Sequence, residues 1–355
     1  MKISGNRGEW SELYALVKLM YMGKLYAADE NVDRISGIHF PILRIIRQKD
    51  YSSQVDYVLN EETVDVLIDG EKVSSLSKDY LKKISSLLLS GIRLGVDRAF
   101  EIPGAPEAME EMQIEKIKAS SADKADIVMQ IHDIHTGYEQ VCGFSIKSEL
   151  GNPPTLLNAS GATNFIYEVY GLSDEDMNRI NSIDSRNKIL DRVMAISEKG
   201  SMQFVRTANS IFASNLMLID SYMDDIIAEI LLDYYLDKAS TCKDLVDLIE
   251  NCNPLGYPRR GFYEYKIKKF LCSVALGMMP SKEWNGQDEA NGGYVIVKED
   301  GDVLVYHLYN RGAFESYLLD NTKLERGSTS RHGFARIYKE DSRYFINFNL
   351  QIRFM

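Results

Sequence analysis

The sequence predicts a mixed α/β protein with a helical middle region and a β-rich C-terminal part. In the first 172 residues, runs of β-branched residues alternate with helical patterns. Between residues 173 and 291, apolar residues recur at spacings of three and four. Short runs rich in Tyr, Val, Ile and Phe follow from residue 292. We therefore divide the chain into three regions, 1–172, 173–291 and 292–355.

The first region begins with a helix pattern over residues 8–22, whose apolar positions cover most of the helix circumference and predict burial. Strand patterns follow at 40–46 and 63–68. The second of these leads into Asp69-Gly70, a dipeptide typical of tight hairpin turns. A further helix is predicted over residues 78–92.

The middle region contains a buried helical stripe with apolar residues every three or four positions. Its members are Leu216, Ile219, Met223, Ile226, Ile227, Ile230 and Tyr234. The C-terminal region instead shows strand patterns at 294–297, 303–308 and 344–354. The pattern therefore changes from helix to strand near residue 292.

Composition indicates a globular protein. The 355 residues are 45% hydrophobic and 26% charged, and no run approaches the roughly 18 apolar residues of a membrane span. The net charge of −11 argues against a general nucleic-acid coat, although a DNA enzyme can concentrate its cations in one cleft. The four cysteines form no CxxC pair, which favours a reducing cytoplasm.

Two strand patterns, at 126–134 and 141–148, predict a hairpin that carries the most informative residues. Because side chains alternate along a strand, Ser145 and Lys147 share one face. A tight turn centred on Thr136-Gly137 would place Asp126 opposite Lys147, and Val128 opposite Ser145. A carboxylate and an ammonium group would then lie side by side.

This pair suits hydrolysis of a phosphodiester. A carboxylate can hold Mg²⁺, which prefers oxygen ligands and keeps several waters. The metal and Lys147 together would activate a water and stabilise charge on the phosphate. Two structural alternatives stay open: an ordinary cross-strand ion pair between Asp126 and Lys147, and a hydrogen-bonded core serine at Ser145.

Asp126 followed by Ser145-Ile146-Lys147 resembles a variant of the PD-(D/E)xK nuclease motif. Longer blocks, spread over nearly the whole chain, resemble HpaII-type type II restriction endonucleases. These blocks lie at 5–12, 143–158, 265–286 and 347–353.

The resemblance implies a PD-(D/E)xK-type mixed sheet flanked by helices, and Mg²⁺-dependent cleavage of double-stranded DNA. Asp126 would be a metal ligand and Lys147 the catalytic lysine. The implied target is a short palindrome, with CCGG the best-known sequence of the family. A palindrome favours a homodimer, at least on DNA, because twofold protein symmetry matches twofold DNA symmetry. A restriction enzyme also requires a cognate DNA methyltransferase that protects its host.

One position departs from the family motif, which has Asp or Glu where this chain has Ser145. A hydroxyl is a poorer metal ligand than a carboxylate, so another acid is expected to supply the missing charge. We assign this role to Glu12, on a largely buried face of the first helix. Glu9 shares that face, but its position in the first turn favours interaction with the helix dipole.

Two segments are candidates for DNA binding. The small polar stretch 158–164 includes Asn158, Thr163 and Asn164, which could approach DNA phosphates closely; a capped helix N-terminus is the structural alternative. The segment 322–339 carries a net charge of +4 and includes the candidates Arg326, Arg331 and His332. Arginine suits recognition of guanine, although a solvated basic face is equally compatible with this composition.

A second hypothesis of a different class follows from Ser145. If this residue marks a lost acid, the chain would be a DNA-binding module with weak or absent cleavage activity on a nuclease-like scaffold. Tight binding of DNA without cleavage in Mg²⁺ or Mn²⁺ would distinguish it from an endonuclease.

Overall fold

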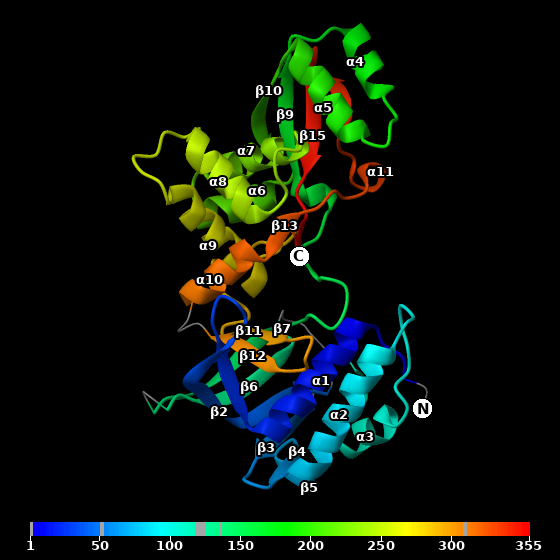
Figure 1. Cartoon of the computed structure of the whole chain (residues 1–355), viewed down its shortest axis with the longest axis vertical. Coiled ribbons are helices and arrows are strands. Elements are labelled where there is room, and N and C mark those ends of the chain that lie inside the picture. Colours follow the sequence, from blue (N-terminus) through cyan, green and yellow to red (C-terminus); the bar gives the residue numbers. More distant parts are fainter. Residues whose placement is uncertain (1–2, 50–52, 118–124, 135–136, 308–310) are drawn as a thin grey trace. The chain divides into compact units, whose positions relative to one another are not determined.

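The computed structural model describes residues 3–49, 53–117, 125–134, 137–307 and 311–355. The chain forms two compact units (Figure 1). The first consists of Met1–Pro154 and Asp288–Phe314, and the second of Thr155–Gln287 and Glu315–Met355. Among the described residues, no helix combines the length and apolarity that crossing a membrane requires.

This division differs from the boundaries expected from the sequence. Residues 155–172, assigned above to a nuclease core, belong to the second unit, and residues 292–314 belong to the first. The reason is a parallel pairing between β11 (Gly293–Val297) and β7 (Glu139–Ser148). It brings a strand from late in the chain into the sheet that contains the predicted hairpin.

The described residues of the first unit form a nine-stranded mixed sheet with the order β1-β12-β11-β7-β6-β2-β3-β4-β5. Strand β1 also pairs with the first half of β2. The strands β1, β12, β11, β7, β6 and β2 therefore form a closed ring. The remaining strands are β1 (Lys24–Ala28), β2 (Arg34–Gln48), β3 (Gln54–Leu59), β4 (Thr63–Ile68), β5 (Glu71–Ser77), β6 (Ile127–His132) and β12 (Val303–His307).

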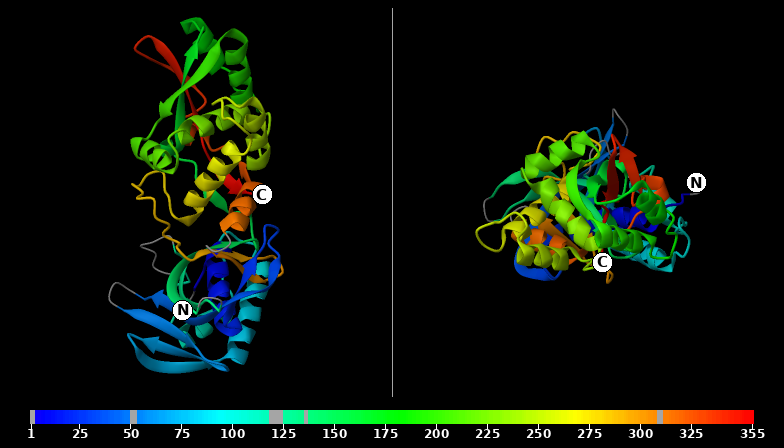
Figure 2. Two further views of the ribbon diagram at one scale, coloured as in Figure 1. Left: turned by 90° about the vertical axis from the view of Figure 1, so that its left-hand side faces the viewer. Right: turned by 90° about the horizontal axis from the view of Figure 1, so that it is seen from above.

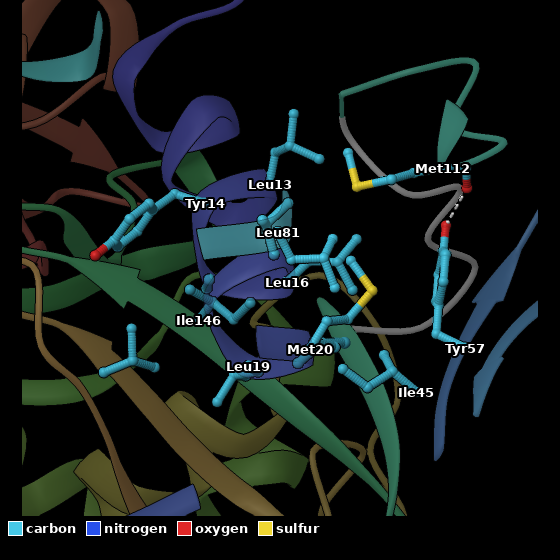
Figure 3. Close-up of a cluster of buried hydrophobic side chains, with 14 of the residues drawn as sticks. Leu13, Tyr14, Leu16, Leu19, Met20, Ile45, Tyr57, Leu81, Met112 and Ile146 are labelled. Carbon is cyan, nitrogen blue, oxygen red and sulfur yellow. Dashed lines mark hydrogen bonds between the residues drawn. The ribbon is translucent and has the colours of Figure 1, made fainter. Parts of the chain in front are cut away.

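Helix α1 (Arg7–Met22) confirms the predicted N-terminal helix. Asn6 and Glu9 form a capping box at its start, and Gly23 ends it. Helices α2 (Lys78–Leu94) and α3 (Ala105–Glu111) also belong to the first unit, and α1 and α2 lie on the same side of the sheet (Figures 1 and 2). The core joins apolar side chains of α1 and α2 to those of the sheet (Figure 3).

Other local predictions for the first unit are also confirmed. Strands β4 and β5 form the expected hairpin, and both Asp69 and Gly70 have positive φ angles. The predicted strand at 40–46 lies within the longer β2, and the predicted helix at 78–92 corresponds to α2. The mixed α/β class is therefore correct.

The second unit contains two small sheets in its described residues, with the orders β10-β9-β15-β14 and β13-β16-β8. The strands are β8 (Thr155–Leu157), β9 (Asn164–Tyr170), β10 (Ser201–Thr207), β13 (Thr322–Leu324), β14 (Ile337–Glu340), β15 (Arg343–Asn349) and β16 (Ile352–Phe354). A 3₁₀ turn, η1 (Gly161–Thr163), directly precedes β9.

Most helices of the second unit come from the predicted helical region, namely α4 (Asp174–Asn181), α5 (Lys188–Lys199), α6 (Ser210–Ile219), α7 (Met223–Tyr235), α8 (Cys242–Cys252) and α9 (Phe262–Leu276). Two details correct the prediction. The region includes β10, which pairs with β9, and the apolar stripe is divided between α6 and α7, because α6 ends at Ile219 with Asp220 as its C-cap. The predicted strands at 294–297 and 303–308 correspond to β11 and β12, with Leu308 outside the described residues. The single strand predicted at 344–354 is wrong, because this segment is divided into β15 and β16, which belong to different sheets. Helices α10 (Arg311–Asp320) and α11 (Thr329–His332) precede β15.

Candidate active site

Asp126 directly precedes β6 and lies opposite Ser145 on β7. The ladder pairs Ile127 with Phe144, and the N–H of Asp126 donates to the carbonyl of Phe144 at 2.9 Å. The predicted register, with Asp126 opposite Lys147, is therefore wrong by two residues. A shift of two preserves the face of each side chain, so Ser145 and Lys147 still share the face of Asp126.

The register differs because the turn is centred earlier than predicted. The N–H of Asp133 donates to Tyr138 O at 2.9 Å, and the N–H of Gly137 donates to Asp133 O at 2.7 Å. Gly137 has a φ of 71° and ends the turn instead of lying at its centre. Thr136, the other residue of the predicted turn centre, lies outside the described residues.

The carboxylate of Asp126 is oriented by two hydrogen bonds to one oxygen. Its Oδ2 accepts the main-chain N–H of Ile146 at 2.7 Å and the hydroxyl of Ser145 at 3.2 Å. No described residue donates a hydrogen bond to its Oδ1. The side chain is half-buried, so this second oxygen is the one left to bind a further group.

A glycine on β7 allows this close approach. A Cβ atom on Gly143 would lie 2.7 Å from the Cβ of Ala125, the residue before Asp126. The N–H of Gly143 donates to Asn291 Oδ1 at 2.8 Å, which fixes the strand at this point. Any larger residue at 143 would displace the segment that carries Asp126.

Lys147 and Glu12 line the same cleft of the first unit, which has a volume of about 620 Å³. Asp126 is tied to this cleft through Ile146, which also lines it. The complete lining is Asn6, Arg7, Gly8, Glu12, Val96, Asp97, Arg98, Ile146, Lys147, Ser148, Gly151, Asn152 and Pro154. Of the four residues predicted to be catalytic, Lys147 and Glu12 lie in this cleft. Asp126 and Ser145 contact each other on the neighbouring hairpin and are not part of the cleft lining.

The two glutamates of α1 have different surroundings. Glu9 Oε2 accepts the N–H of Asn6 at 2.9 Å, and Asn6 Oδ1 accepts the N–H of Glu9 at 3.0 Å. The expected placement of Glu9 as a favourable acid in the first helical turn is therefore confirmed. Glu12, one turn further along the helix, is half-buried and faces the cleft.

Two other polar residues belong to the surroundings of the hairpin. Arg47 on β2 donates to the carbonyls of Lys116 and Ile117 at 2.6 and 2.9 Å, and thereby holds the described end of the segment that leads towards Asp126. Burial raises the pKa of Glu149, the carboxyl group that directly follows β7. Sequence patterns gave no sign of either environment.

Thr163 and Asn164, two of the predicted DNA-binding residues, are buried in the second unit, with 0% and 4% exposure. Thr163 Oγ1 accepts the N–H of Ser160, and Asn349 Nδ2 donates to both Thr163 Oγ1 and Asn164 Oδ1. Asn164 Nδ2 donates to the carbonyl of His332 at 2.8 Å. Their polar atoms serve this internal network, which argues against the predicted direct contact with DNA.

The other candidates of the second unit lie close to this network. Asn158 and Arg331 are exposed, and His332 is half-buried at the end of α11. Arg326 Nη2 lies 3.4 Å from Asp237 Oδ1. A Cβ atom on Gly327 would lie 2.9 Å from Ala159 Cβ and 3.2 Å from His332 Cδ2, so the two predicted DNA-binding segments are neighbours.

Comparison with known proteins identifies the family of the chain. A model of the HpaII restriction endonuclease family matches residues 6–354. The chain is 43% identical over 357 residues to the type II restriction enzyme HpaII of Haemophilus parainfluenzae, and the match covers 99% of each chain. No solved structure matches the chain.

Proposed function

The chain belongs to the HpaII restriction endonuclease family and is a site-specific deoxyribonuclease, and we propose that it cleaves double-stranded DNA at CCGG with Mg²⁺ as cofactor. The proposed core is of the PD-(D/E)xK type. The observation that carries the proposal is the hydrogen bond from Ile146 N–H to Asp126 Oδ2, which fixes this carboxylate beside the cleft lined by Lys147 and Glu12.

The oxygen atoms available at this site suit Mg²⁺. Within the described ranges, no group of three or more His, Cys, Asp and Glu side chains could hold an ion. Mg²⁺ is commonly held by only one or two carboxylates, with waters and substrate phosphate completing its shell. Asp126, through its Oδ1, and Glu12 would be these carboxylates. When bound, Mg²⁺ would lower the pKa of a coordinated water and offset negative charge on the phosphate.

The residues of the chain have separate tasks. The ammonium group of Lys147 stabilises charge that develops on the cleaved phosphate. Ser145 donates to Asp126 Oδ2 and so keeps this carboxylate in one orientation. Ser145 therefore acts as a positioning residue for Asp126, and the acid expected at its place in the motif is supplied by Glu12. With Asp126, Glu12 and Lys147 all present, a scaffold without cleavage activity is not favoured.

Sequence recognition is proposed for the second unit. Arg331 is exposed and makes no ion pair with any other described residue, and a guanidinium group can bind guanine through two hydrogen bonds. Asn158, His332 and Arg326 would contact the same DNA. A palindromic target further favours a homodimer on DNA, and a cognate methyltransferase would protect the same sequence in a reducing cytoplasm.

The proposal is tested by digestion of a genome of known sequence with Mg²⁺, followed by sequencing of the fragment ends. We expect discrete fragments that all end within CCGG, no cleavage in EDTA, and no cleavage by Lys147→Ala. Ends at unrelated sequences would contradict the target. Full activity of Lys147→Ala would contradict the catalytic assignment.

A further inference from the structure

Two loops complete the cleft beside Lys147 and have no role in the proposed chemistry. One contributes Val96, Asp97 and Arg98, and the other contributes Gly151, Asn152 and Pro154. The cleft lining contains three cationic side chains and two acidic ones. The cations are Arg7, Arg98 and Lys147, and the acids are Glu12 and Asp97. Three basic side chains in one cleft can bind more than a single phosphate group.

Arg7 joins these two loops to each other and to α1. Its Nη2 donates to the carbonyl of Gly95 at 2.6 Å, and its Nη1 makes a longer contact of 3.5 Å with the carbonyl of Leu150. A Cβ atom on Gly151 would lie 3.2 Å from Arg7 Cδ, so a glycine at 151 leaves room for this side chain. Both of these partners are neutral carbonyls and not carboxylates, so the contacts that fix the two loops do not offset the charge of the guanidinium group.

Arg98 is the exposed cation that these loops present. It makes no hydrogen bond or ion pair with any other residue in the described part of the chain. Its neighbour Val96 is 90% exposed, and the amide of Asn152 is exposed on the other loop. A guanidinium group, an amide and an apolar side chain together match the phosphate and sugar of a nucleic-acid strand.

We infer that Arg98 binds a backbone phosphate adjacent to the cleaved bond, with Asn152 as a second donor and Arg7 as the residue that positions both loops. This inference rests on the proposed function, because it takes Lys147 as the contact to the cleaved phosphate. A strand held at Lys147 continues through the same cleft, and its next phosphates pass Arg98. The contact is independent of sequence, so it adds affinity and fixes register without specifying bases.

The test measures binding of CCGG and unrelated duplexes in Ca²⁺ at several salt concentrations. We expect Arg98→Ala to weaken binding of both duplexes by about tenfold and to reduce the slope of log K against log salt by about one. Lys83→Ala is the matched control, because Lys83 is an exposed cation of α2 outside the cleft. It should change neither quantity.

A second arm locates the contact on the DNA. Each phosphate near the cleaved bond is replaced in turn by an uncharged methylphosphonate. In the wild-type protein, neutralising the phosphate bound by Arg98 should weaken binding, and in Arg98→Ala the same replacement should have no further effect. This phosphate should lie within two nucleotides of the cleaved bond.

Three outcomes would overturn the inference. Arg98→Ala could retain wild-type affinity and salt dependence, it could respond to every methylphosphonate as the wild type does, or its coupled phosphate could lie far from the cleaved bond. These outcomes leave cleavage at CCGG intact and so differ from a failure of the proposed function. If the wild-type protein bound no duplex at all, both proposals would be overturned.

Discussion

Asp126 and Ile146 are joined by a 2.7 Å hydrogen bond from the main-chain N–H of Ile146 to the Oδ2 of Asp126. A main-chain donor cannot rotate away, so the carboxylate is held at Ile146, the residue that precedes Lys147 in β7. The hydroxyl of Ser145 adds a longer bond of 3.2 Å to the same oxygen. The main chain of β7 therefore orients the Asp126 carboxylate more strongly than the hydroxyl of Ser145 does.

Ser145→Ala should therefore reduce cleavage only modestly. The Ile146 bond remains, and a single hydrogen bond is worth about 0.5–1.5 kcal/mol, so the single-turnover rate should fall by no more than about tenfold. Asp126→Asn should reduce the same rate by at least about a hundredfold, because a metal ligand is lost. Equal losses in the two variants would show that Ser145 acts directly on the metal or the substrate.

Glu12→Gln should raise the Mg²⁺ concentration needed for half-maximal cleavage by at least about tenfold, because a neutral amide binds Mg²⁺ more weakly than a carboxylate. Titration of the cleavage rate with Mg²⁺ measures this shift. Glu9→Ala is the control from the same helix. It should lower the free energy of unfolding by about 1 kcal/mol through loss of the capping box, with the Mg²⁺ requirement unchanged. A raised Mg²⁺ requirement in Glu9→Ala, with an unchanged requirement in Glu12→Gln, would show that Glu9 and not Glu12 is the metal ligand.

His307 should make the first unit less stable in mild acid. It is 3% exposed, and burial lowers its pKa to about 4, while Asp133 acts in the opposite direction. Between this value and the ordinary value of about 6.5, the unfolded chain binds the proton and the folded chain does not. Stability therefore rises with pH through this window and is constant above it.

The titration of His307 alone should make the free energy of unfolding about 2 kcal/mol lower at pH 5 than at pH 7.5. Urea unfolding of the wild type and His307→Gln at both pH values isolates the effect, because all other groups are shared. The variant should lose less stability than the wild type on acidification. The same loss in both proteins would show that His307 does not titrate in this way.

Arg331→Ala should reduce discrimination between CCGG and duplexes with one changed base pair. Loss of a guanidinium–guanine contact costs about 1–3 kcal/mol of discrimination at the contacted position. Competition binding against single-base variants measures this loss. Arg343→Ala removes another exposed cation of the second unit, one paired with Glu168, and should leave discrimination unchanged. A uniform loss across all duplexes for Arg331→Ala would indicate a phosphate contact instead.

Local features of the first unit were predictable from the sequence because short-range chemistry determines them. Helix α1, the hairpin of β4 and β5, and the shared face of Ser145 and Lys147 follow from periodicity and turn residues. The predicted register of β6 and β7 was wrong by two residues, because the position of the turn was not predictable. Gly137, which has a positive φ angle, ends the turn instead of lying at its centre.

Features that join distant parts of the chain could not be predicted. The pairing of β11 with β7 connects Tyr294 to Ser145 across the intervening segment Thr155–Gln287 of the second unit, and no local pattern encodes it. The burial of Thr163 and Asn164 depends on Asn349 from the other end of the second unit. For the same reason, the sequence gave no sign that Arg98 and Lys147 line one cleft.

A structure of the protein bound to a CCGG duplex with Ca²⁺ would test the central claim most directly. We expect an ion within about 2.6 Å of carboxylate oxygens of both Asp126 and Glu12, with the Lys147 ammonium in hydrogen-bond contact with the phosphate at the cleavage position. An ion bound away from Asp126, or a Lys147 side chain directed away from that phosphate, would contradict the account.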